Sequence, residues 1–180
     1  MNCALRKWRL SDAKDLATAL NNEKILNNLR DGLPFPYTEK DAAEYISAML
    51  SADENSTFAY AVTVDDRAVG SIGAFRQSNI HCKTAELGYY LAEEYWGRGL
   101  MTEAAKQVIV YGFEYIGLDV MMIRTGEENL ASQRIIEKCG FQYEGTLRRI
   151  YRIYDGTVKP VRCYTMLREE YDGLRQAGVL

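Results

Sequence analysis

Apolar residues recur along this chain with two different periods, and the changes of period divide it into predicted helices and strands. Residues 3–8 indicate a short first strand. Apolar positions at helical spacing then predict two helices. One follows Ser11, a residue type favoured as an N-cap, and the other follows Thr38, which forms the pattern of a capping box with Asp41. Residues 27–37 contain two prolines and predict a loop between these helices.

After the second helix the apolar positions alternate with a period of two, which is typical of strands. The remaining predicted elements are strands at residues 58–64, 68–75 and 84–92, a long helix at 100–116, a short strand at 120–124, a compact helix at 129–138, and two strands at 141–154 and 158–167 joined at Asp155-Gly156. No repeat or linker-like segment interrupts this pattern. The order predicts one α+β domain that spans residues 1–180 and contains a mixed sheet.

Composition narrows the classes of function that the chain can have. Its 180 residues carry a formal net charge of −3, which argues against a general nucleic-acid-binding protein. The single histidine excludes a metal site built from several histidines. The four cysteines have no C-x-x-C spacing, and no apolar run approaches the length of a membrane span. The N-terminus has no apolar signal segment, so we expect reduced thiols, no metal, no membrane partner and a cytoplasmic location.

The first segment with candidate chemistry is Tyr95-Trp96-Gly97-Arg98-Gly99-Leu100-Met101-Thr102. Two glycines between a predicted strand and a predicted helix would place successive backbone N–H groups at the positive end of the helix dipole, where phosphate groups bind. The segment lacks both the Gly-Lys-Ser/Thr of a P-loop and the third glycine of a dinucleotide-binding fingerprint. Taken alone, a plain turn is the commoner interpretation of such a segment.

The second segment opens the predicted helix at 129–138. Asn129 and Ser132 lie one helical turn apart, so both side chains could face the same ligand. The residues by themselves favour a simpler interpretation, in which Asn129 caps the helix and Ser132 occupies its first turn.

The two segments, taken together and in this order, resemble the GNAT superfamily of acetyl-CoA-dependent N-acetyltransferases. The similarity is greatest to its ribosomal-protein-alanine acetyltransferase (Rim-type) branch. It rests on Trp96-Gly97-Arg98-Gly99 and on N-x-x-S-x-x-x-x-E-K-x-G-F from Asn129 to Phe141, and it extends to Leu33–Thr38 and Ala85–Leu91. The resemblance implies a three-layer α/β fold, in which a mixed, largely antiparallel sheet of about seven strands has helices on both faces. It also implies transfer of an acetyl group from acetyl-CoA to a primary amine by direct attack in a ternary complex.

The resemblance further implies where coenzyme A binds. We expect its pyrophosphate on the backbone amides of Gly97 to Thr102, and its pantetheine beside the strand at 86–92, which should splay from the next strand. Met101 stands where the family has a small residue, and its side chain is large enough to crowd the start of the helix. The expected cofactor-binding residues are Leu91, Ala92, Trp96, Gly97, Arg98, Gly99, Leu100, Met101, Thr102, Asn129, Ser132 and Lys138.

The chain departs from the family at the positions that transfer protons. Ile136 stands where many members have a tyrosine as general acid, so Ser132 and Tyr151 become the candidates for protonating the departing thiolate. Glu86 is the candidate base, acting directly or through a water molecule. The alternative role for Glu86 is that of a strand carboxylate in a structural hydrogen bond.

The sequence leaves the acceptor amine open among a protein N-terminal alanine or serine, a free amino acid, a polyamine and another small amine. A second class of function is an acyl-CoA-binding module of the same fold without efficient transferase activity, which the missing tyrosine and Met101 would favour. A monomer and a homodimer are both consistent with the chain.

Overall fold

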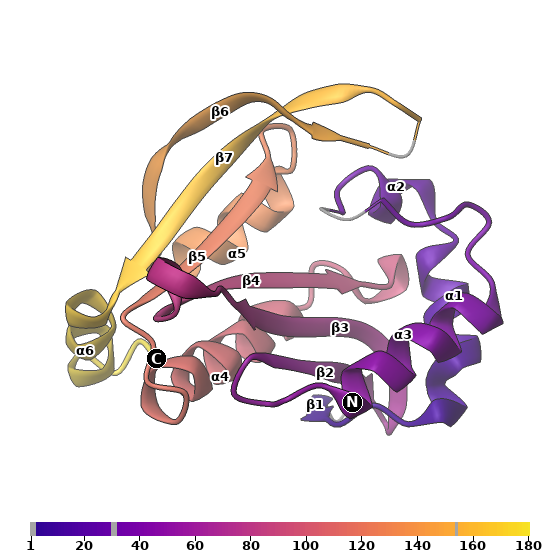
Figure 1. The fold of residues 1–180 in the computed structure, drawn as a ribbon, viewed down its shortest axis with the longest axis horizontal. Coiled ribbons are helices and arrows are strands. Elements are labelled where there is room, and N and C mark those ends of the chain that lie inside the picture. Colours follow the sequence, from indigo (N-terminus) through magenta and orange to yellow (C-terminus); the bar gives the residue numbers. More distant parts are fainter. Residues whose placement is uncertain (1–2, 30–31, 154) are drawn as a thin grey trace.

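The computed structural model describes residues 3–29, 32–153 and 155–180, and these residues form a seven-stranded sheet in the order β1-β2-β3-β4-β5-β7-β6 (Figure 1). β4 and β5 pair in parallel, whereas the other neighbouring strands pair antiparallel. The predicted mixed, largely antiparallel sheet is therefore confirmed. The strands are β1 (Cys3–Arg6), β2 (Thr57–Val64), β3 (Arg67–Arg76), β4 (Thr84–Leu91), β5 (Val120–Gly126), β6 (Gln142–Arg152) and β7 (Val158–Leu167).

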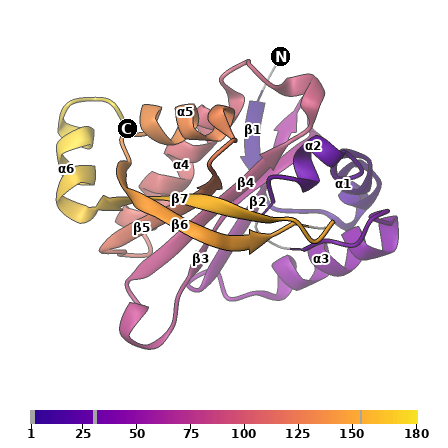
Figure 2. The same cartoon turned by 90° about the horizontal axis from the view of Figure 1, so that it is seen from above.

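Helices cover both faces of the sheet, as predicted, and each face has its own apolar core (Figure 2). The larger core joins α4 and α5 to the sheet through buried side chains such as Ile109 and Ile136. The smaller core joins α1 and α3 to the opposite face through side chains such as Leu16 and Ile46. The helices are α1 (Ala13–Leu20), α2 (Glu23–Leu26), α3 (Glu39–Ser51), α4 (Leu100–Glu114), α5 (Leu130–Lys138) and α6 (Arg168–Gln176).

The start of α1 differs from the prediction. Ser11 is not an N-cap but lies exposed within a 3₁₀ turn that precedes the helix. The buried carboxylate of Asp12 fixes this turn instead. It accepts hydrogen bonds from the backbone N–H of Arg9 at 2.8 Å and from the guanidinium of Arg6 at 2.8 Å. A carboxylate that pairs with a cation and a backbone donor outweighs the weaker capping preference of the neighbouring serine.

The start of α3 agrees with the prediction. The backbone N–H of Asp41 donates to Thr38 Oγ1 at 3.2 Å, and the backbone N–H of Thr38 donates to Asp41 Oδ2 at 2.8 Å. The capping box is therefore confirmed, and α3 begins at Glu39.

Two helices of the structure were not predicted from the apolar pattern. α2 has four residues, which is too short to display a helical period. α6 buries a single residue, Tyr171, so it presents no apolar stripe. The ends of several strands and helices also differ from the prediction. β1 stops at Arg6, α4 stops at Glu114, and β5 continues to Gly126. Residues 30–31 of the predicted loop and residue 154 of a predicted strand lie outside the described residues.

Replacing Gly140 with alanine should lower the free energy of unfolding by about 2 to 3 kcal/mol. Gly140 follows α5 with φ of +91°, and a Cβ there would lie 2.5 Å from Leu174 Cδ1 in α6. Gly156→Ala is the matched control, since Gly156 has φ of +87° but open space around it. The control should lose only about 1 kcal/mol in urea unfolding. Equal losses in the two variants would contradict the role assigned to the contact with Leu174.

Candidate active site

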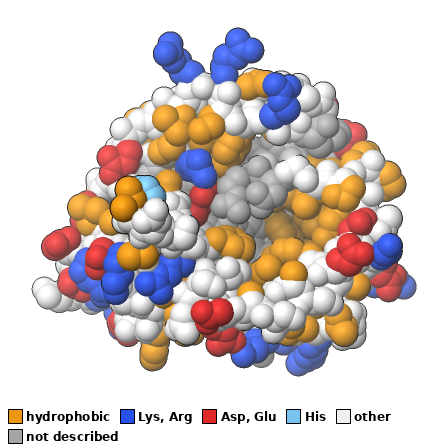
Figure 3. Space-filling view, in the orientation of Figure 1, with side chains coloured by type: hydrophobic (Ala, Val, Ile, Leu, Met, Phe, Trp, Pro, Cys, Tyr) orange, Lys and Arg blue, Asp and Glu red, His pale blue; other side chains and the backbone are white. Residues whose placement is uncertain are grey.

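A cavity of about 740 Å³ opens where β4 and β5 separate. The parallel pairing of these strands covers only Thr84–Glu86 against Val120–Met122, so the rest of β4 diverges from β5. This confirms the predicted splay of the strand. Residues from both sides of the sheet line the cavity, including α1, α2 and the loop after it on one side and the starts of α4 and α5 on the other. Figure 3 shows this face of the molecule hollowed below the β6–β7 hairpin.

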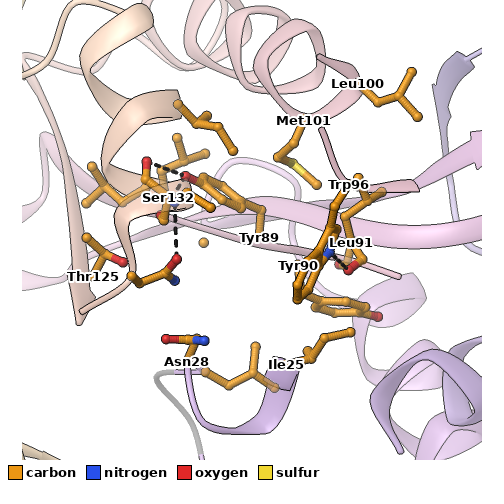
Figure 4. Close-up of a pocket in the computed structure, with 18 of the residues that line it drawn as sticks. Ile25, Asn28, Tyr89, Tyr90, Leu91, Trp96, Leu100, Met101, Thr125 and Ser132 are labelled. Atoms are coloured by element: carbon orange, nitrogen blue, oxygen red, sulfur yellow. Dashed lines mark hydrogen bonds between the residues drawn. The ribbon is translucent and has the colours of Figure 1, made fainter. Parts of the chain in front are cut away.

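The two-glycine turn forms one end of the cavity. Gly97 has φ of +73° and Gly99 has φ of +77°, a backbone conformation that L side chains rarely adopt. α4 begins directly afterwards at Leu100, so its first unpaired N–H groups lie beside the turn. The indole Nε1–H of Trp96 donates to the carbonyl of Leu91 at 2.6 Å and fastens the turn to the end of β4 (Figure 4). The predicted phosphate-binding geometry is thus present at this end.

Met101 does not crowd the start of α4. Its side chain is buried in the larger core, while Leu100, Met101 and Thr102 all contribute to the cavity wall. A long, flexible thioether fits between sheet and helix at a position where the family has a small residue.

The free edge of β4 supplies backbone groups to the cavity. The backbone N–H of Ala92 donates to Val69 O at 2.8 Å across the β3–β4 pair, and Ala92 is not among the cavity-lining residues. In an antiparallel pair, neighbouring residues point their backbone groups to opposite sides. The N–H groups of Tyr89 and Leu91 therefore point into the gap that β5 leaves open. Of the two strand-end residues predicted to bind the cofactor, the structure places Leu91 at the cavity and Ala92 in the sheet.

Basic side chains gather at the same end of the cavity. Arg98 is exposed, with its guanidinium carbon 5.5 Å above the ring of Tyr95. Lys138 lines the cavity from α5, as predicted, and Arg134 joins it one turn earlier. Arg134 was not predicted, because an exposed arginine on a short helix carries no signal in the sequence. The three cations make this end suitable for an anionic ligand.

A hydroxyl pair lies at the middle of the cavity (Figure 4). Ser132 Oγ and Tyr89 Oη are 2.8 Å apart, and the backbone N–H of Ser132 donates to Asn129 Oδ1 at 3.2 Å. Asn129 is therefore the N-cap of α5 and also lines the cavity. Burial raises the pKa of Tyr89, which keeps its hydroxyl protonated at neutral pH. Tyr89 was not predicted, because the contact joins β4 to a helix that is distant in sequence.

Glu86 forms a bidentate pair with Arg124 at the opposite wall. Arg124 Nε donates to Glu86 Oε1 at 2.9 Å, and Arg124 Nη2 donates to Glu86 Oε2 at 2.6 Å. Glu86 is 5% exposed, and both residues line the cavity. The hydrogen bonds that Arg124 donates to Glu86 raise the pKa of Arg124, so the guanidinium stays charged. Arg124 was not predicted, because its place beside Glu86 depends on the parallel register of β4 and β5.

Tyr151 does not line the cavity that holds Ser132 and Glu86. It nevertheless lies close enough to Arg124, the partner of Glu86, to contribute to the raised pKa of that guanidinium. Tyr151 lines a separate, smaller cavity together with Asn27 and Lys159. β6 runs along the edge of the sheet, and register shifts between Leu147 and Tyr151 displace this part of the strand. Of the three candidate catalytic residues, the structure therefore gathers Glu86 and Ser132 in one cavity.

Comparison with known proteins identifies the class of this fold and cavity. The sequence pattern described as "Acetyltransferase (GNAT) domain" matches residues 3–142 of the chain. The chain belongs to the GNAT acetyltransferase family.

Individual relatives agree with this class. The chain is 28% identical over 173 residues, covering 94% of each protein, to the uncharacterized N-acetyltransferase p20 of Bacillus licheniformis. It is 33% identical over 157 residues, covering 84% of this chain and 82% of the relative, to the SPbeta prophage-derived uncharacterized N-acetyltransferase YokL of Bacillus subtilis (strain 168). The solved structure of Mycobacterium smegmatis RimJ in complex with CoA-disulfide has the same fold, with a TM-score of 0.84 at 19% identity over 98% of this chain and 89% of that one. The chain is an enzyme of the N-acetyltransferase class.

The described residues contain neither a membrane-spanning helix nor a metal-binding cluster of side chains. None of their helices is both long and apolar enough to cross a membrane. No group of three or more of their His, Cys, Asp or Glu side chains is placed to hold a metal ion.

Proposed function

We propose that this protein transfers an acetyl group from acetyl-CoA to a primary amine by direct attack in a ternary complex. The observation that carries the proposal is the gap between β4 and β5, which has the two-glycine turn at one end and Glu86 at the opposite wall. A phosphate-binding end and a carboxylate facing one cavity match the two needs of the reaction, which are to hold an anionic acyl donor and to deprotonate an amine. The coenzyme A ligand of the RimJ structure supports the choice of donor.

In this proposal the cavity holds acetyl-CoA in an extended conformation. The pyrophosphate lies on the backbone amides from Gly97 to Thr102, at the positive end of α4. The cations of Arg98, Arg134 and Lys138 stand beside the phosphates. The pantetheine arm follows the free edge of β4, where the N–H groups of Tyr89 and Leu91 point into the gap. This path brings the thioester toward Ser132.

The reaction then proceeds in one bond-forming and one bond-breaking stage. Glu86, directly or through a water molecule, removes a proton from the ammonium group, and the neutral amine attacks the carbonyl carbon of the thioester. The N–H of Leu91 stabilises the oxyanion that develops on the carbonyl oxygen. The carbon–sulfur bond breaks, and the departing thiolate receives a proton from the hydroxyl of Ser132. The nitrogen of the new amide carries a positive charge after the attack, and the proton that it loses restores the hydroxyl of Ser132. Glu86 releases the proton of the ammonium group to water. The hydroxyl of Tyr89 lies 2.8 Å from Ser132 Oγ. In this proposal Tyr89 is the donor of that hydrogen bond, which leaves the serine proton oriented toward the sulfur.

One observation favours the alternative of an acyl-CoA-binding module without efficient turnover. Arg124 donates to both carboxylate oxygens of Glu86, so the carboxylate already takes part in a structural ion pair within the protein. Ile136 is moreover buried in the core, so it contributes no group to proton transfer.

Two measurements on the same preparation separate these functions. If the cavity binds acetyl-CoA, a concentration of about 100 times the Kd should raise the melting temperature by about 5 to 10 °C. Release of free thiol in the presence of an amine panel then reports transfer. Stabilisation without thiol release on a broad panel would support the binding module. Absence of both effects would overturn the proposal altogether.

Replacing Arg98 with alanine should weaken acetyl-CoA binding about 3-fold to 10-fold, because an exposed guanidinium beside a phosphate contributes about 1 kcal/mol. Calorimetric titration with acetyl-CoA measures this change. Arg148→Ala on β6 is the control, since Arg148 is equally exposed but does not line the cavity. An unchanged Kd for Arg98→Ala would show that Arg98 remains over the ring of Tyr95 and does not contact the ligand.

A further inference from the structure

The face of the sheet that carries Glu86 has a hollow in its floor. Gly73 of β3 and Gly88 of β4 are direct register partners. They lie between two other partner pairs, Phe75 with Glu86 and Ser71 with Tyr90. Directly opposed residues of an antiparallel pair project to the same face, so all six positions share one surface, and all six line the cavity. The centre of this surface has no side chains.

The open space lies over Gly88, because Ala59 of β2 covers Gly73: a Cβ built on Gly73 would lie 2.9 Å from both Cα and Cβ of Ala59. A Cβ built on Gly88 would meet only Phe75 Cε2, at 3.9 Å. Phe75 on β3 and Tyr90 on β4 belong to partner pairs that lie four residues apart along the strands, a distance of about 14 Å. The glycine pair lies midway between them. The open space over Gly88 therefore lies between two aromatic side chains, and the ring of Phe75 reaches its edge.

The walls above the hollow are apolar. They come from α1, α2 and the loop that follows, and their most buried members are at most 5% exposed. These members are Leu16, Leu20, Ile25 and Tyr37. A group that enters this space gains by leaving water, and a charged group would lose its hydration without a partner.

The charges around the cavity limit the acceptor further. Among the described residues that line it, Glu86 is the sole carboxylate, and it already holds Arg124. A polyamine has several ammonium groups and would need a carboxylate for each one that it buries. On the α1–α2 side of the cavity, the carboxylate of a free amino acid would have to displace Glu86 from Arg124 or Glu93 from Lys24. Neither class of acceptor fits these partners.

We infer that the open space over Gly88, beside Gly73, is the acceptor subsite, and that it takes a primary amine carried on an uncharged aromatic or branched aliphatic group. This inference rests on the proposed transfer reaction, because it assigns the acceptor side of that reaction. The shared chemistry has two sources, which are the N-terminal residue of a peptide and a small apolar amine. Both place the amino group at Glu86 and the apolar group over Gly88.

The test compares amines in the thiol-release assay at saturating acetyl-CoA. Phenylalaninamide and leucinamide represent a peptide N-terminus, 2-phenylethylamine represents a small amine, and alaninamide and spermidine are the comparison acceptors. The apolar acceptors should exceed alaninamide and spermidine in kcat/KM about 10-fold or more, because burying a large apolar side chain discriminates at this level. A preference for the amides over 2-phenylethylamine would identify the peptide source, and the reverse preference would identify the small amine.

Gly88→Val fills the space over Gly88 and tests directly whether the acceptor binds there. Gly88 suits the change because the new side chain enters open space, whereas a Cβ on Gly73 would lie 2.8 Å from Phe58 O. The variant should lose about 10-fold in kcat/KM for phenylalaninamide and less than 3-fold for alaninamide, with the Kd for acetyl-CoA unchanged. Gly88→Ala should lose less than Gly88→Val.

Two kinds of result would contradict the acceptor subsite. Spermidine or alaninamide used as well as phenylalaninamide would overturn the subsite while leaving the transfer reaction standing, and so would a uniform loss for all amines in Gly88→Val. Binding of acetyl-CoA without thiol release from any amine would overturn the transfer reaction and the subsite together.

Discussion

Glu86→Gln is expected to lower kcat/KM about 100-fold to 1000-fold near pH 7, the range that a positioned general base contributes. The change keeps the shape of the side chain and removes its negative charge. Glutamine can still accept a hydrogen bond from Arg124 but cannot take a proton from the acceptor. Steady-state thiol release with a saturating acyl donor measures the loss.

The pH dependence distinguishes a base from a structural carboxylate. An α-ammonium group has a pKa of about 8 and an alkylammonium group a pKa of about 10.4, so the neutral amine is scarce near pH 7 and abundant above those values. A base is needed only while the amine is protonated. The deficit of Glu86→Gln should therefore shrink as pH rises through the pKa of the acceptor. A deficit of constant size across that range would show that Glu86 serves only to hold Arg124.

Arg124→Lys is the companion variant for this test. Lysine keeps a positive charge beside Glu86 but cannot form the bidentate pair that the guanidinium makes at 2.9 and 2.6 Å. If Arg124 holds the carboxylate in place, this variant should lose about 10-fold in activity with no change in the shape of the pH profile. Binding of acetyl-CoA by both variants, measured as an increase in melting temperature, provides the control for folding.

Ser132→Ala should lower kcat about 10-fold to 100-fold and leave the Kd for acetyl-CoA within about 3-fold. The hydroxyl acts on the departing thiolate, so its removal affects the chemical step more than ground-state binding. The backbone hydrogen bond from Ser132 to Asn129 remains in the variant, and α5 keeps its cap. An unchanged kcat would exclude Ser132 as the proton donor.

Tyr89→Phe is matched to this variant because it removes the same hydrogen bond from the other partner. Phenylalanine keeps the ring in the cavity wall and deletes only the hydroxyl that lies 2.8 Å from Ser132 Oγ. If Tyr89 only orients the serine, the loss in kcat should be about 3-fold to 10-fold, less than that of Ser132→Ala. The double variant should then be no slower than Ser132→Ala alone, since the two residues act as one unit.

The sequence predicts best those features that are encoded locally. The two-glycine turn, the capping box at Thr38 and the alternating strands each depend on residues that are close together along the chain, and all of them are present in the structure. The resemblance to the GNAT family adds the mixed, largely antiparallel sheet of about seven strands and the splay of β4. Glu86 and Ser132 are correctly placed at one cavity because they belong to motifs of that family.

The features that were missed depend on contacts between distant segments. Arg124 reaches Glu86 only through the register of two strands whose connection contains a whole helix. Tyr89 reaches Ser132 across the gap between β4 and α5. α6 is held to the body of the protein by Tyr171, whose ring stacks on that of Phe113 at a centroid distance of 4.6 Å. No local pattern of apolar and polar residues encodes such partners.

The brief parallel pairing of β4 and β5 has a mechanical consequence. Among the described residues, the strand pairing between the β1–β4 part of the sheet and the β5–β7 part covers three residue pairs, and the ion pair of Glu86 with Arg124 adds a side-chain link across it. A seam of this length divides the sheet into two panels, and the panels are the natural units of partial opening. A ligand with amide groups could bond to the free edge of one panel in the way that a neighbouring strand does. If its phosphates also rest on the helices that pack against the two panels, the ligand would act as an additional strand across the seam. Occupancy of the cleft would then couple the two panels into a single cooperative unit.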